Sequence, residues 1–133
     1  MRYLLDTDTC VDIIRQKLPA VLTRLRREPV GTVCISTITL SELDYGVEKS
    51  SDPDRNRIAL TEFLTPLQVL PYDDRAATRY GAIRAGLEAR GVPISSLDLL
   101  IAAHALSLGL TVVTGNGREF ARVPGLQVEN WRR

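Results

Sequence analysis

Short apolar runs alternate with longer segments of helical periodicity along this chain, and this alternation limits the fold more than any other feature. The short runs are rich in Leu, Val and Ile, and they occupy residues 3–6, 32–36, 68–70, 110–114 and 126–129. Almost continuously apolar strands separated by helices are typical of a parallel sheet that is buried on both faces. The sequence therefore predicts an α/β fold with a mainly parallel central sheet flanked by helices.

The segments between these strands show the apolar spacing and the end signals of helices. Helices are expected at residues 9–28, with an interruption near Pro19, and at 38–49, 52–65, 73–90 and 95–108. Ser95 or Ser96 is a suitable N-cap for the last of these helices, and Gly109 is a suitable residue to end it.

Length and composition exclude several classes of protein. The chain has 133 residues, 44% of them hydrophobic and 25% charged, as in an ordinary globular protein, and we expect one domain over residues 1–133. No apolar run is long enough for a transmembrane helix, and we expect no secretion, because the first residues lack the pattern of a signal peptide. Cys10 and Cys34 lack the spacing of a zinc site and are expected to be reduced and buried. We therefore expect a cytoplasmic protein with no membrane association.

The charged residues are unevenly distributed although the net charge is only +1. Lys17 and Lys49 are the only lysines among the 17 basic residues, so the rest are arginines, which bind phosphate in a bidentate manner. Acids dominate residues 1–14, and arginines dominate residues 15–28. An acidic site surrounded by arginines would suit an enzyme acting on a polyanion, but charge alone favours solvated helix faces.

Polar side chains follow the ends of the predicted strands, where ligands bind in parallel sheets. These candidate site residues are Asp6, Glu42, Asp98, Thr114, Asn116 and Glu119. Taken singly, Asp6 has a simpler interpretation as a cap and Glu42 as a solvent-facing residue. Asp98 can likewise be a first-turn acid stabilised by the helix dipole. Because the acids come from separate segments that lead to the same edge, their combination favours a functional site.

Clustered carboxylates repel one another and need protons, basic partners or a hard cation. An all-oxygen site suits Mg²⁺ or Mn²⁺, which activates water and neutralises phosphate charge. Phosphodiester hydrolysis by water is therefore the simplest chemistry for this site. His104 lies in an apolar helix and is expected to be a packed, hydrogen-bonded residue rather than a base. Residues 115–117 form either a tight turn or a loop that phosphate approaches closely.

Four stretches of the chain together match one known family. They are YLLDTD at residues 3–8, ISTITLSELDYG at 35–46, DLLIAAHA at 98–105 and VTGNGREF at 113–120. In this order and spacing the sequence resembles the PIN-domain ribonucleases, specifically the VapC toxins of VapBC toxin–antitoxin pairs. The segments SELDYGVEKS and REFARVPGLQVENW are most similar to the VapC branch that cuts initiator tRNA in its anticodon loop.

The resemblance implies a PIN-like fold and a Mg²⁺- or Mn²⁺-dependent endoribonuclease that inhibits translation by cutting tRNA. By position, Asp6 and Asp98 would be the main metal ligands and catalytic residues. Glu42 would complete the first acidic triad, directly or through water, and Glu119 would share the fourth, more variable position with Asn116. The family also implies a homodimer and a larger complex in which a VapB antitoxin wraps the toxin and blocks its site.

The sequence departs from the family pattern at three places. The first motif usually reads Asp-Thr-Asn and here ends in Asp8, which either touches the metal or hydrogen-bonds locally. Residues 95–96 are Ser-Ser where Gly-Pro is frequent, and Gly115 replaces a second Asn in the strand-end motif. Thr114 and Asn116 retain supporting positions there. None of the departures removes a core acid, so an active enzyme is expected.

Two alternatives come from other functional classes. The first is a haloacid-dehalogenase-like phosphatase with Asp6 as nucleophile and Asp8 as acid–base group. That family needs a later lysine, and none follows Lys49. The second is a non-catalytic module that binds RNA or protein and uses its acids structurally.

Overall fold

The computed structural model describes residues 1–132 and contains a five-stranded, wholly parallel sheet. Its strands are β1 (Tyr3–Leu5), β2 (Val33–Ser36), β3 (Gln68–Leu70), β4 (Thr111–Val113) and β5 (Val128–Glu129). Their order across the sheet is β3-β2-β1-β4-β5. Every predicted strand is present, and because all pairings are parallel, the carboxyl ends of the strands lie at one edge.

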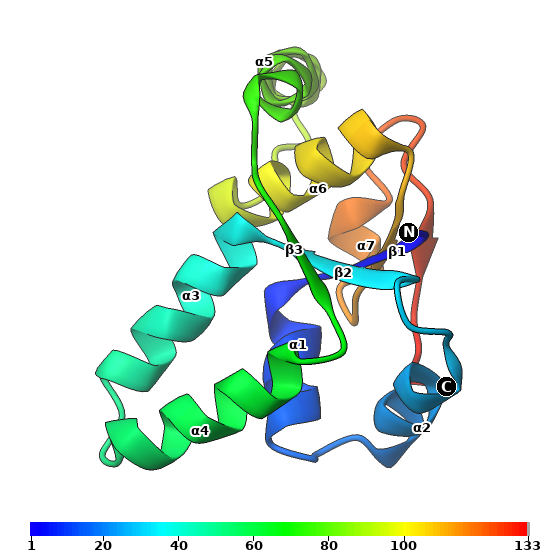
Figure 1. Cartoon of the computed structure of the whole chain (residues 1–133). Coiled ribbons are helices and arrows are strands. Elements are labelled where there is room, and N and C mark those ends of the chain that lie inside the picture. Colours follow the sequence, from blue (N-terminus) through cyan, green and yellow to red (C-terminus); the bar gives the residue numbers. More distant parts are fainter. Residues whose placement is uncertain (133) are drawn as a thin grey trace.

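Helices cover both faces of this sheet (Figure 1). They are α1 (Thr7–Ile14), α2 (Pro19–Arg27), α3 (Thr37–Glu48), α4 (Pro53–Leu64), α5 (Asp74–Ala89), α6 (Ser96–Leu108) and α7 (Gly117–Phe120). In Figure 1, α5 and α6 lie above the sheet, and α1, α2 and α4 lie below it. Within the described residues no helix combines the length and the apolar character needed to cross a membrane.

The helices begin and end close to the predicted residues, because the sequence carries their end signals. The hydroxyl of Ser95 accepts a hydrogen bond from the Asp98 N–H at the start of α6, over 3.3 Å. Gly109 ends that helix with a φ of 67° in the left-handed region, which glycine adopts without steric cost. The segment at residues 9–28 forms two helices because Pro19 occupies the first turn of α2.

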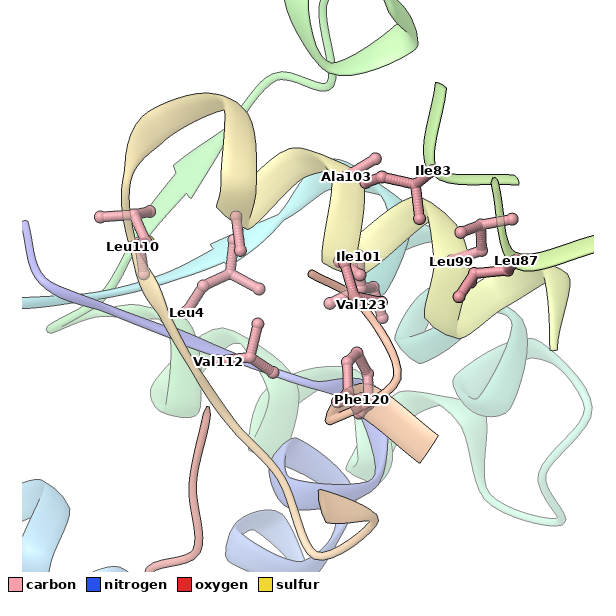
Figure 2. Packing of buried hydrophobic residues seen from close by; sticks show 13 residues of the cluster. Leu4, Ile83, Leu87, Leu99, Ile101, Ala103, Leu110, Val112, Phe120 and Val123 are labelled. Carbon is pink, nitrogen blue, oxygen red and sulfur yellow. The ribbon is translucent and has the colours of Figure 1, made fainter. Parts of the chain in front are cut away.

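Alternating side chains of each strand form two separate hydrophobic cores. Leu4 of β1 belongs to the core beneath α5 and α6, whereas Tyr3 and Leu5 belong to the core beneath α1, α2 and α3. Figure 2 shows the first core, in which Leu4 of the sheet, Ile101 of α6 and Phe120 of α7 lie together. The sheet is thus buried on both faces, as its apolar strands predict.

The short helix α7 was not among the predicted elements. The sequence indicates only a turn or a phosphate-approach loop at residues 115–117, and the structure adds one helical turn directly after it. Phe120 at its end is fully buried in the first core. A single turn is too short to show helical periodicity, so tertiary burial of Phe120 determines this conformation.

Candidate active site

The carboxylate of Asp6 lies at the end of β1 and is held by donors from two other segments. It is only 2% exposed, and it caps α1 by accepting a hydrogen bond from the Thr9 N–H over 2.9 Å. Its other oxygen accepts a hydrogen bond from the Thr114 hydroxyl over 2.5 Å. Burial raises the pKa of Asp6, and these hydrogen bonds oppose the rise. Asp6 is therefore a buried carboxylate fixed at the carboxyl edge of the sheet.

The loop after β4 links Asp6 to the start of α6. The Asn116 N–H donates to the Thr114 hydroxyl over 2.8 Å, so Thr114 bridges Asp6 and Asn116. The Asn116 side-chain amide lies 2.5 Å from a carboxylate oxygen of Glu119 and 3.5 Å from one of Asp98. One hydrogen-bonded network therefore contains these polar side chains from β1, α6 and the β4–α7 segment.

Asp98 and Glu119 form a pair of carboxyl groups with opposite pKa shifts. Burial and the neighbouring Glu119 raise the pKa of Asp98 to about 6, and the charge of Asp6 adds to this rise. Burial also acts to raise the pKa of Glu119, but hydrogen bonds involving Ser95, Asp98 and Asn116 outweigh it and lower that pKa. The Ser95 N–H donates to Glu119 over 2.5 Å. The hydrogen-bond donors therefore stabilise the charged form of Glu119, whereas the charge of Asp98 is less well compensated.

Glu42 and Asp8 lie outside this network. Glu42 is exposed on α3 and lines a cavity of about 190 Å³ together with Val11 and Arg15. Asp8 is exposed in the first turn of α1. Within residues 1–132 no hydrogen bond joins either side chain to Asp6 or Asp98. The roles predicted for Glu42 and Asp8 remain predictions.

The remaining polar candidates have structural surroundings. His104 is 1% exposed, and its Nδ1 lies 2.8 Å from the Ser36 hydroxyl, as expected for a packed histidine. Cys10 and Cys34 are free and buried, also as predicted. The backbone N–H groups of Thr9 and Ser95, which hold Asp6 and Glu119, were not predicted, because side-chain patterns carry no signal for backbone donors.

The donor set is chemically suited to a hard divalent cation. Asp6, Asp98, Glu119 and Asn116 all offer oxygen atoms. Burial and the neighbouring carboxylates raise the pKa of Asp98, and a cation would counter both effects. Among the described residues, no three Asp, Glu, His or Cys side chains lie close enough to form a preassembled metal cage. Mg²⁺ commonly binds through one or two carboxylates and keeps several waters, so a site with two carboxylates, such as Asp6 and Asp98, could hold it.

Known proteins match this chain along almost its whole length. Residues 3–126 match the family model of the PIN domain. The chain is 45% identical over 131 residues to the tRNA(fMet)-specific endonuclease VapC of Salmonella typhimurium, with 98% of each chain covered. It is 41% identical over 131 residues, again with 98% of each covered, to Ribonuclease VapC2 of Haemophilus influenzae.

Solved structures give the same result. The fold matches a chain of the DNA-bound VapBC crystal structure from Salmonella typhimurium with a TM-score of 0.93, 45% identity and 98% coverage of each chain. A chain of VapBC2 from Rickettsia felis, bound to a promoter DNA fragment, matches with a TM-score of 0.90 at 37% identity, covering 98% of this chain and 99% of that one. The chain belongs to the PIN-domain family and, within that family, to the VapC proteins.

Proposed function

We propose that this protein is the toxin of a VapBC pair and a metal-dependent endoribonuclease that cuts the anticodon loop of initiator tRNA. The observation that supports this most strongly is the network that joins Asp6, Thr114, Asn116, Asp98 and Glu119 at one edge of the sheet. It lies in a chain that is 45% identical to a tRNA(fMet)-specific endonuclease. Asp8, the acid–base group of the alternative phosphatase, is exposed outside the network, and the family match favours the nuclease.

In this proposal Asp6 and Asp98 hold Mg²⁺ or Mn²⁺. When bound, such a cation neutralises phosphate charge and increases the acidity of water. Thr114 and the Thr9 N–H fix the Asp6 carboxylate, so its oxygens keep one orientation. Asn116 holds the carboxylates of α6 and α7 at a common position. The chain thus supplies a fixed set of oxygens to which a phosphodiester and an attacking water can be brought in line.

The proposed partner is a VapB antitoxin, and the structure offers an apolar groove for it. A cavity of about 470 Å³ lies between α1, α2 and α4, with Leu22, Leu25 and Phe63 among its lining residues. Val30 at its border is 88% exposed, which is unusual for so apolar a side chain. Both similar crystal structures named above are VapBC complexes. We therefore place an apolar antitoxin segment in this groove, in an assembly that also contains a toxin homodimer.

Cleavage of purified tRNA tests the proposed function. Antitoxin-free protein is incubated with total tRNA and Mg²⁺, with EDTA in a parallel reaction, and the new RNA ends are sequenced. Asp6→Asn and Asp98→Asn serve as matched variants that keep the side-chain size and remove one charge each. We expect a Mg²⁺-dependent cut in the initiator tRNA anticodon loop that both variants lose.

Other outcomes separate the parts of this proposal. Intact tRNA together with cut ribosomal RNA, in a further reaction on purified ribosomes, would keep the nuclease and overturn the tRNA target. Full cleavage by Asp98→Asn would overturn the assignment of Asp98. No cleavage of any RNA by metal-loaded protein would support the non-catalytic binding module.

A further inference from the structure

The C-terminal residues leave the sheet at the same edge as the acids. Strand β5 pairs in parallel with β4, with Val113 opposite Glu129, and the Thr114 N–H donates to the Glu129 carbonyl over 3.0 Å. Residues 130–132 therefore lie beside residues 114–116. The segment is part of the surroundings of the candidate active site although no motif in the sequence indicates this.

A buried tryptophan fixes this segment in place. Trp131 is 3% exposed, and its ring meets that of Tyr3 edge to face with centroids 5.2 Å apart. Its indole N–H donates to Glu129 over 3.2 Å. The side chain of Asn130 accepts a hydrogen bond from the Arg132 N–H over 2.8 Å, which forms a local turn. Arg132 is thus positioned by an anchored turn.

The guanidinium of Arg132 occupies the space that a side chain at position 115 would fill. A Cβ atom built on Gly115 would lie 1.4 Å from Arg132 Nη1. The backbone of Gly115 is outside the left-handed region, so its conformation does not itself require glycine. Gly115 directly follows Thr114, whose hydroxyl holds Asp6. The glycine therefore allows a positive charge to lie next to the Asp6 network.

Asp12 of α1 holds one end of this guanidinium. Its carboxylate accepts a hydrogen bond from Arg132 Nη2, and the Arg132 side chain is 31% exposed. Within the described residues, Nη1 and Nε make no further hydrogen bond. A guanidinium that is tethered at one nitrogen and open at the others is suited to a phosphate group.

We propose that Arg132, tethered by Asp12 and lying against Gly115, binds an RNA phosphate that flanks the scissile bond. The carboxylates at the edge of the sheet repel a polyanion, and Arg132 supplies an attractive charge at the α1 side of that edge. This inference rests on the proposed ribonuclease function. It assigns a substrate-binding role to Arg132 and no part in the bond-breaking step.

Kinetics of Arg132→Gln test this role. With Mg²⁺ and an anticodon stem-loop RNA, we expect KM to rise about tenfold, the effect of one charged hydrogen bond, with kcat within about twofold of wild type. The slope of log affinity against log salt should become shallower by about 0.7, as for the loss of one phosphate contact on a single strand. Arg55→Gln, at an exposed position of α4, is the matched control and should change neither quantity.

Gly115→Ala provides a second, independent variant. The added methyl group displaces the guanidinium of Arg132 without removing its charge. The KM of Gly115→Ala should therefore rise as well. The double variant Gly115→Ala/Arg132→Gln should be no worse than Arg132→Gln alone, because both changes remove one interaction. Thermal melting of each variant checks that the fold is intact.

The outcomes distinguish this inference from the proposed function. If wild-type protein cuts no RNA, the proposed function fails. If wild type cuts RNA and Arg132→Gln has unchanged KM and salt slope, only the role of Arg132 is overturned. An Arg132→Gln variant with increased kcat/KM would also overturn it, since the guanidinium would then be blocking the site. Fluorescence polarisation of labelled RNA on Asp98→Asn protein, with and without Arg132→Gln, measures the binding step without cleavage.

Discussion

Single hydroxyl and amide groups determine how the acids of this site are held. The Thr114 hydroxyl donates a hydrogen bond to the Asp6 carboxylate and accepts one from the Asn116 N–H. Asn116 in turn contacts two carboxylates. If the acids bind a metal as proposed, replacing the residues that orient them should change activity by about 10- to 100-fold. The supporting residues are therefore as testable as the acids.

Replacing Thr114 by Val should reduce cleavage about 10- to 100-fold, because Val keeps the shape of Thr and removes the hydroxyl that holds Asp6. Thr114→Ser retains a hydroxyl and should recover most of the activity. The measurement is the single-turnover cleavage rate over a range of Mg²⁺ concentrations. A Thr114→Val enzyme as fast as Thr114→Ser would show that the Asp6 contact has no part in catalysis.

Asp98→Asn should stabilise the metal-free protein at pH 7. The pKa of Asp98 is raised from 3.8 to about 6, so the folded state binds this proton more tightly than the unfolded state. Stability from this group is full below about pH 4 and is lost as pH rises through 6. After allowance for solvent screening, we expect Asn to add about 1 kcal/mol to the free energy of unfolding at pH 7.

Urea denaturation in EDTA at pH 4.5 and pH 7 measures this effect. Asp74→Asn is the control, because Asp74 is an acid in the first turn of α5 that is exposed to solvent. Mg²⁺ should stabilise wild type and have little effect on Asp98→Asn. Equal stability of wild type and Asp98→Asn at both pH values would contradict the prediction.

At the scale of residues, the sequence predicted only some of the acids that lie near one another. Asp6, Asp98 and Glu119 are brought together because they follow strand ends or begin a helix, which the sequence pattern reveals. Glu42 lies more than one turn after the start of α3, and its side chain is exposed to solvent. The contact between Arg132 and Gly115 depends on where the final turn places one flexible side chain. No pattern of spacing contains that information.

At the level of elements, the capping residue of one helix also links that helix to its neighbours. The Ser36 hydroxyl accepts the Ile38 N–H over 3.0 Å at the start of α3, and it also lies 2.8 Å from His104 Nδ1 of α6. One side chain therefore joins β2, α3 and α6. His104 Nε2 has no hydrogen-bond partner among the described residues, so Ser36 supplies the one side-chain hydrogen bond to this ring there.

Ser36→Ala should lower the free energy of unfolding by about 2–3 kcal/mol, because it removes a helix cap and leaves a buried imidazole without its partner. Ser41→Ala is the control. The Ser41 hydroxyl is exposed, and within residues 1–132 its one hydrogen bond is to the Thr37 carbonyl of its own helix, over 3.1 Å, so its loss should cost under about 0.5 kcal/mol. Chemical denaturation measures both, and similar losses for the two variants would be inconsistent with the bridging role.

The elements themselves were largely predictable because their ends are marked by local chemistry. Ser95 and Gly109 define α6, and Pro19 separates α1 from α2. The short helix α7 was missed because its conformation depends on the burial of Phe120 in the core between the sheet and α6. Local sequence signals therefore suffice for the long helices and fail where tertiary packing determines the conformation of a single turn.

The molecule as a whole has its acid edge and its apolar groove on different parts of its surface. The acids lie at the carboxyl edge of the sheet, and the groove lies between α1, α2 and α4. Antitoxin binding and RNA cleavage should therefore be separable by mutation. The residues that line the groove come from three helices and the segments next to them, and helical periodicity did not distinguish the helical ones from ordinary core positions.

Val30→Glu should weaken VapB binding at least about tenfold, because it places a charge at the border of the apolar groove. RNA cleavage should remain near wild type. Ile58→Glu is the matched control, since Ile58 is 61% exposed and lies outside the groove lining. Isothermal titration with the cognate VapB and a parallel cleavage assay measure the two effects. An unchanged affinity of Val30→Glu for VapB would show that the antitoxin does not bind in this groove.

The order of the strands across the sheet also has a consequence for synthesis of the protein in the cell. Strand β4 lies between β1, which is made first, and β5, which is made last. A nascent chain of residues 1–108 contains Asp6 and Asp98 but neither Thr114 nor Glu119. A nascent chain of that length therefore lacks part of the candidate active site. Under the proposed function, the growing chain gains its nuclease site only after β4 and α7 have left the ribosome and folded against β1.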